Sequence, residues 1–110
     1  MPDRAAGLLN SRMAKLTAAQ IRAALPTVPG WKRQGRAITR TYELRDFARA
    51  MRFVNAVARL AERAWHHPDI VILWYRVTLT LTTHDAGGLT AKDFILAGKF
   101  DVLATPKARR

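Results

Sequence analysis

The 110-residue chain has no cysteine, few acidic residues and no long apolar run. The missing cysteine excludes a disulfide framework, a thiolate zinc site and a cysteine nucleophile. The longest hydrophobic run, Ile70 to Tyr75, is the length of a strand and well short of the ~20 apolar residues that span a membrane. An apolar run at 7–9 is too short for the core of a signal peptide. We therefore expect a cytoplasmic protein with no membrane contact.

The scarcity of acidic residues gives the chain a strong positive charge, because eight of them accompany nineteen basic residues, a formal charge of +11. Such an excess indicates either an anionic partner such as nucleic acid or a solubilising surface. Residues 1–61 carry a net +9, residues 62–106 a net −1, and the last four residues add +3. A nucleic-acid module should interleave aromatic with basic side chains, whereas Phe47 and Phe53 do not follow the neighbouring arginines. The charge therefore does not indicate nucleic acid as the main partner.

The length and the hydrophobic content of 49% predict one folded domain. We expect this domain over residues 16–104. A flexible basic N-terminal tail, 1–15, and a basic C-terminal tail, 105–110, are expected to flank it.

Hydrophobic spacing predicts the elements of this domain. Thr17 and Gln20 form a capping box at the start of a first helix that ends near Pro26, and Thr90 and Asp93 repeat the pattern before a last helix ending near Leu103. Between them we expect a hairpin, a long helix and a second hairpin, over 31–44, 46–64 and 69–83. The fold class is α+β, in the order α-β-β-α-β-β-α, with a four-stranded antiparallel sheet and three helices packed on one face.

The long helix shows the clearest periodicity of the chain. We expect an inward apolar face and, opposite it, a solvated arginine face. The apolar set is Phe47, Ala50, Met51, Val54, Val57, Ala58 and Ala61, and the arginine set is Arg45, Arg49, Arg52, Arg59 and Arg63.

All three histidines lie within nineteen residues, at His66, His67 and His84. Imidazole is the side chain best suited to proton transfer near neutral pH. Because the second hairpin brings its two ends together, we expect His84 within reach of His66 or His67. A histidine at a helix C-terminus can also simply complement the helix dipole. Histidines beside a carboxylate can also bind a metal, although the metalloprotease spacing and thiolates are absent.

The residues Glu62, His66-His67-Pro68, Trp74, His84 and Asp93, with their spacings, resemble the signature of the pterin-4a-carbinolamine dehydratases. The resemblance covers about residues 16–104 and implies the same α-β-β-α-β-β-α fold. It implies a hydro-lyase, a 4a-hydroxytetrahydrobiopterin dehydratase, which removes water from 4a-hydroxytetrahydropterin to give quinonoid dihydropterin. Such enzymes recycle the pterin of an aromatic amino acid hydroxylase. The chemistry requires no cofactor and no metal.

By position, the resemblance implies that His66, His67 and His84 are the active-site histidines. We expect His67 and His84 to be the main acid/base pair, with His66 binding or assisting; which of the pair is the acid stays open. Asp93 either orients a histidine or only caps its helix, and Glu62 either tunes His66 from one turn away or is merely solvated.

Two further signature-region residues have alternative interpretations. Trp74 either stacks on the pterin or, as we favour, packs in the core. Thr83, beside His84, is a candidate for a hydrogen bond to the substrate.

The resemblance also bears on partners. It implies a pterin substrate, a homodimer or homotetramer, and an aromatic amino acid hydroxylase as the upstream enzyme. The alternative function is a non-catalytic one, a dimerisation or interaction module, or a basic nucleic-acid-binding module, on the same fold.

Overall fold

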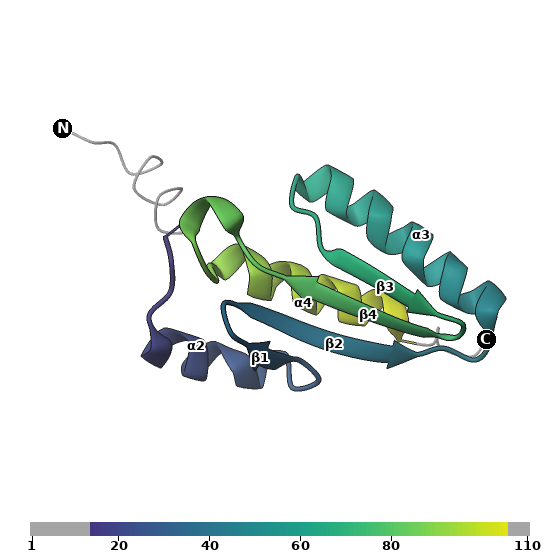
Figure 1. Ribbon diagram of the computed structural model, residues 1–110, viewed down its shortest axis with the longest axis horizontal. Helices are drawn as coiled ribbons and strands as arrows, with labels where there is room; N and C mark the ends of the chain where they lie inside the picture. Colours follow the sequence, from purple (N-terminus) through teal and green to yellow (C-terminus); the bar gives the residue numbers. More distant parts are fainter. Residues whose placement is uncertain (1–13, 106–110) are drawn as a thin grey trace.

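The computed structural model describes residues 14–105, and this part of the chain forms three α-helices, two short 3-10 helices and four strands (Figure 1). The expected tails at 1–15 and 105–110 therefore lie almost entirely outside the described residues. The elements run in chain order as α2 (Ala18–Ala24), η1 (Leu25–Thr27), β1 (Lys32–Gln34), β2 (Ala37–Glu43), α3 (Phe47–Ala64), β3 (Asp69–Leu73), β4 (Arg76–Leu81), η2 (His84–Ala86) and α4 (Ala91–Ala104).

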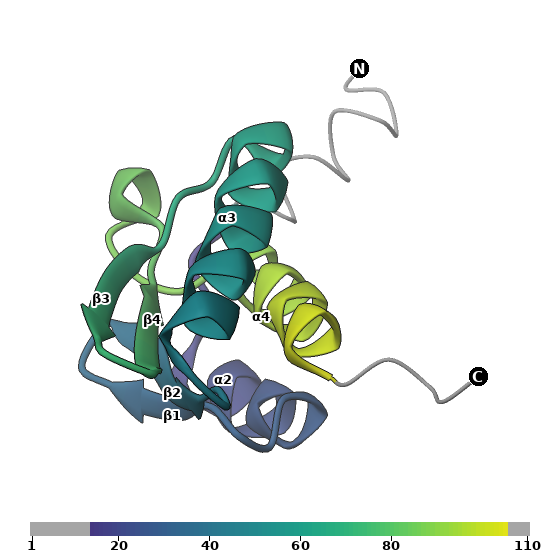
Figure 2. The same cartoon turned by 90° about the vertical axis from the view of Figure 1, so that its right-hand side faces the viewer.

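The four strands form one antiparallel sheet in the order β1-β2-β4-β3. All three α-helices cover the same face of this sheet (Figure 2). The predicted α+β architecture is thus confirmed. β4 shows the alternation read from the sequence, because Val77, Leu79 and Leu81 are fully buried against the helices while the threonines between them are half-buried.

Side-chain caps fix where the helices begin. Both predicted capping boxes form, at Thr17 with Gln20 and at Thr90 with Asp93. Asp46 caps α3 by accepting from the backbone N–H of Arg49 at 2.8 Å. Backbone donors that would otherwise lack partners are satisfied locally, so these starts could be read from short stretches of sequence.

The long helix departs from its expected apolar face at two positions. Phe47, in its first turn, is 52% exposed, and Ala58 is also exposed. The buried side chains of α3 are Ala50, Phe53, Val57 and Ala61. Phe53 was not among the residues expected on the apolar face. It is buried because the buried stripe of α3 runs through residues 50, 53, 57 and 61. The arginine face is solvated as expected.

A polar cluster ties α4 to β2 far from the histidines. Asp101 Oδ1 accepts from Trp31 Nε1 at 2.9 Å, from Arg40 Nη1 at 2.9 Å and from the Tyr42 hydroxyl at 2.5 Å. Arg40 interrupts the apolar face of β2, and Asp101 neutralises it there. Burial, followed by the adjoining Asp101 carboxylate, raises the pKa of Tyr42 far above its ordinary value.

None of the helices that the structure describes between residues 14 and 105 has the length and apolar character needed to cross a membrane.

Candidate active site

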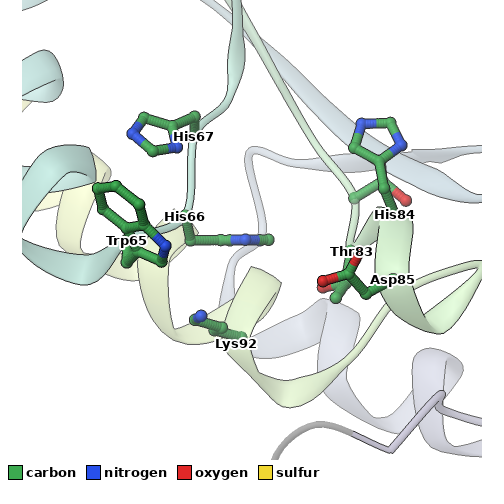
Figure 3. Close-up of a pocket in the computed structure, with 8 residues that line it drawn as sticks. Trp65, His66, His67, Thr83, His84, Asp85 and Lys92 are labelled. Carbon is green, nitrogen blue, oxygen red and sulfur yellow. The ribbon is translucent and has the colours of Figure 1, made fainter.

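The three histidines line one cavity of about 310 Å³ (Figure 3). Figure 3 shows the His66 ring between two walls, with His67 and Trp65 on one side and His84 on the other. The complete lining is Trp65, His66, His67, Thr82, Thr83, His84, Asp85 and Lys92. The structure therefore brings together residues from the end of α3, the end of β4 and the start of α4.

The end of α3 aims the first two histidines. Trp65 terminates the helix in the left-handed conformation, with φ of 54°, and the His66 N–H bonds back to the carbonyl of Ala61 at 3.1 Å. After this reversal of the chain, His66 lies against Asp93 in the first turn of α4. Pro68 then leads His67 into the extended backbone of β3.

His84 arrives from the returning strand. Asp69 of β3 pairs with Thr80 of β4, so the start of β3 and the end of β4 lie side by side. His84 follows β4 by three residues and opens η2. Its side chain is exposed, and no carboxylate within residues 14–105 lies within ion-pair distance of it.

His66 and Asp93 form the buried floor of the site. His66 Nε2 lies 2.6 Å from Asp93 Oδ1, and the Asp93 side chain is completely buried. Asp93 Oδ2 accepts from the Thr83 hydroxyl at 2.8 Å and from the Thr90 N–H at 2.9 Å. The sequence left open whether Asp93 orients a histidine or caps α4. In the structure Asp93 does both: Oδ1 contacts His66, and Oδ2 caps α4 by accepting from the Thr90 N–H.

His67 has a different environment, because it is about half exposed. Its Nε2 lies 2.7 Å from Glu62 Oε1, and its ring and the Trp65 indole form a T-shaped pair with centroids 5.6 Å apart. Of the two interpretations of Glu62, the one in which it tunes His66 is wrong, because its partner is His67; the side chain is exposed, as the other interpretation expected. One turn of helix separates Glu62 from His66 in sequence, but the reversal at Trp65 carries His66 away from that face.

The structure also bears on two other residues. Thr83 lines the cavity, and its buried hydroxyl donates to Asp93 with Thr90 Oγ1 at 2.9 Å, so it supports the floor; its hydrogen bond to a substrate stays a prediction. Trp74 is 72% exposed in the β3–β4 turn, so core packing is wrong. That turn lies at the far end of the hairpin from the start of β3 and the end of β4 (Figure 1). Trp74 does not line the histidine cavity.

Sequence reasoning missed Lys92 and Asp85, which also line the cavity. Lys92 stands beside Asp93 in the first turn of α4, and Asp85 follows His84. Their adjacency to signature residues was the available signal. Within the described residues, no group of three or more histidine, aspartate or glutamate side chains is arranged to hold a metal ion.

A sequence model of the family described as pterin 4 alpha carbinolamine dehydratase matches residues 14–103. The chain is 55% identical over 93 residues to the protein named "Putative pterin-4-alpha-carbinolamine dehydratase" of Thermomicrobium roseum, covering 84% of this chain and all of that protein. A protein of the same name from Roseiflexus sp. is 55% identical, over 79% of this chain and 94% of its own length.

Two solved structures share the fold. A transcriptional coactivator/pterin dehydratase from Brucella melitensis has a TM-score of 0.80 and 34% identity, covering 83% of this chain and 99% of its own. A pterin dehydratase-like protein identified as a RuBisCO assembly factor in the alpha-carboxysome has a TM-score of 0.61 and 25% identity, covering 71% and 93%.

Proposed function

Because the chain belongs to the pterin-4a-carbinolamine dehydratase family, we propose that it removes water from 4a-hydroxytetrahydropterin to give quinonoid dihydropterin. The observation that carries this proposal is the cavity lined by three histidines, two of them open to solvent and one held by a buried aspartate. An aromatic amino acid hydroxylase is the proposed source of the substrate.

The reaction needs one proton donor and one proton acceptor. The bond from C4a to the hydroxyl oxygen breaks, and an acid protonates that oxygen so that it leaves as water. A base takes the proton of the adjacent ring nitrogen, whose electron pair then forms the new double bond to C4a. Each assisted proton transfer is worth about 10²- to 10⁴-fold in rate.

We assign the acid and the base to His67 and His84, which lie on opposite sides of the cavity (Figure 3). Both are exposed and can therefore exchange protons with solvent between turnovers. His66 is buried, and its Nε2 is occupied by Asp93. This environment suits His66 to hold the substrate, or the residues next to His66, in place. Because the pair must start in opposite protonation states, the rate should show a bell-shaped pH profile.

The test is a dehydration assay in which a hydroxylase generates the substrate in situ. We expect His67→Ala and His84→Ala each to lower kcat by about 10²-fold or more, with an unchanged circular dichroism spectrum. Arg59→Ala, on the solvated face of α3, is the matched control and should keep the full rate. An undiminished rate in the His67→Ala/His84→Ala double variant would overturn the proposal.

We also propose that the protein forms a homodimer or homotetramer. β3 is an edge strand, and its outward side chains Val71 and Leu73 are 50% and 65% exposed. Soluble monomers usually protect such apolar edges. Light scattering should give two or four times the 12.4 kDa chain mass, and Leu73→Lys should reduce it. A monomeric mass for the unsubstituted protein would contradict this.

A non-catalytic interaction role is the second candidate, because the Brucella melitensis relative is described as a transcriptional coactivator as well as a pterin dehydratase. The exposed arginine face of α3 gives it a surface to test. Binding to a random oligonucleotide with a steep salt dependence, without pterin turnover, would favour a nucleic-acid module over the enzyme.

A further inference from the structure

We propose that the substrate is a pterin whose ring substituent ends in an anionic group, a phosphate or a carboxylate, and that Arg36 binds this group beside the histidine cavity. The inference rests on the proposed dehydratase function and specifies its substrate class. It starts from a second cavity that the histidine chemistry does not use.

This second cavity, of about 290 Å³, adjoins the first. Its lining is Arg36, Ala37, Thr82, His84, Gly87 and Gly88. Thr82 and His84 line both cavities, so the two share a wall at the catalytic histidine. A bicyclic ring held among the histidines can thus extend a substituent past His84 into the second cavity.

The charges around the second cavity favour an anion. Its lining contains Arg36 and no carboxylate, whereas Asp85 lines the histidine cavity instead. Within residues 14–105 Arg36 forms no ion pair, unlike Arg40, which Asp101 neutralises. A guanidinium presents paired donors that match phosphate and carboxylate oxygens, so an unpaired arginine at a cavity wall is suited to such a group.

The backbone that carries Arg36 is held against the site. The Thr82 hydroxyl donates to the Arg36 carbonyl at 2.6 Å, and β2 pairs with β4 immediately afterwards, at Ile38 with Leu81. The arginine therefore leaves the β1–β2 turn from a fixed point next to His84. Its long side chain remains exposed and free to meet a ligand.

The side chain of a second basic residue, Lys15, lies against Gly88, which lines this cavity. The N–H of Leu16 bonds to the carbonyl of Leu89 at 2.8 Å, which holds the preceding residue, Lys15, alongside Gly88. A Cβ at Gly88 would come within 3.1 Å of Lys15 Cε, so the absence of a side chain there leaves room for the lysine. Part of the positive charge of the N-terminal half is thus gathered beside the site.

The experiment compares three substrates that differ only in the ring substituent: an uncharged methyl group, a chain ending in a phosphate monoester, and a chain ending in a carboxylate. For Arg36→Gln we expect KM to rise roughly ten-fold for the anionic substrates, with kcat unchanged, and KM for the methyl substrate to stay as it is. In the unsubstituted protein, added salt should raise KM for the anionic substrates alone.

The matched control is Arg33→Gln. Arg33 lies on the same hairpin, and its Nε donates to the Gly35 carbonyl at 3.0 Å, but it does not line the cavity. It should leave all three KM values unchanged. The anionic substrate with the larger response to Arg36→Gln identifies phosphate or carboxylate as the preferred group.

Binding of the corresponding dihydropterins, followed by tryptophan fluorescence, separates the two proposals. Tighter binding of the anionic dihydropterins that Arg36→Gln abolishes would support the anion site even if no substrate were turned over, in which case only the proposed function fails. Turnover of all three substrates with equal KM, and no response to Arg36→Gln, would overturn the anion site and leave the dehydratase standing.

Discussion

At the scale of single residues, Asp93 shows how one carboxylate satisfies two demands. One oxygen holds His66, and the other caps α4 and accepts from Thr83. From sequence alone these were competing interpretations, because spacing locates a cap but gives no information on a partner twenty-seven residues away. A fully buried carboxylate keeps such contacts because an unpaired charge there would be strongly destabilising.

Asp93→Asn tests whether Asp93 positions His66 or only stabilises the fold. We expect the free energy of unfolding to fall by about 1–3 kcal/mol and kcat by roughly 10²-fold, since a misplaced imidazole loses its alignment. Urea denaturation and steady-state kinetics measure the two effects.

The control for Asp93→Asn is Thr83→Val, which removes a hydrogen bond from the other oxygen. It should lower stability by about 1 kcal/mol and leave kcat essentially unchanged. If both variants lost rate in proportion to their loss of stability, Asp93 would have only a structural role.

At the scale of elements, the helix starts were predictable and the backbone at the ends of α3 and β3 was not. Capping boxes depend on residues three apart, so they can be read directly from the sequence. Trp65 and Trp74 both adopt positive φ, at 54° and 63°, where glycine would be expected. Tertiary context imposes these conformations, and this is also why the sequence did not indicate the contact between Glu62 and His67.

Trp65→Gly separates stability from function at the end of α3. A side chain other than glycine in the left-handed region costs roughly 1 kcal/mol, and Trp65 is 74% exposed, so little packing is lost. We expect the free energy of unfolding to rise by about 0.5–1 kcal/mol. The rate should fall about three- to ten-fold, because the indole no longer contacts His67 at the cavity wall.

Trp74→Gly is the matched variant, since it removes the other exposed tryptophan of positive φ at the far end of the hairpin. It should leave the dehydration rate unchanged. An equal loss of rate in both variants, or a less stable Trp65→Gly protein, would contradict the assignment of Trp65 to the site.

At the scale of the whole molecule, the order of elements along the chain and the single helical layer were predictable from periodicity, because burial against one core enforces it along every element. The order of the strands within the sheet was not predicted. The lining of the histidine cavity was only partly predictable from the sequence. Asp85 and Lys92 line the histidine cavity from two separate elements, Arg36 lines the adjoining second cavity, and no local pattern relates the three.

The structure places a carboxylate near each end of α4, and the two have different roles. Asp93 at its start belongs to the site, while Asp101 near its end fastens the helix to the sheet through Trp31, Arg40 and Tyr42. The fold should therefore depend on the protonation of Tyr42. Its pKa is raised in the folded state, first by burial and then by Asp101, so the folded chain retains a proton that the unfolded chain releases above pH of about 10.

The stability that Tyr42 provides is thus complete below its unfolded pKa and is lost as pH rises from about 10 towards its folded pKa, by up to about 1.4 kcal/mol per pH unit. Urea denaturation over this range should show a shallower decline for Tyr42→Phe than for the unsubstituted protein. Tyr75→Phe, which removes the other tyrosine of the chain, should keep the steep decline. Equal slopes in all three proteins would mean that Tyr42 ionises as readily in the folded chain as in the unfolded one, and that the Asp101 cluster does not couple α4 to β2 through this proton.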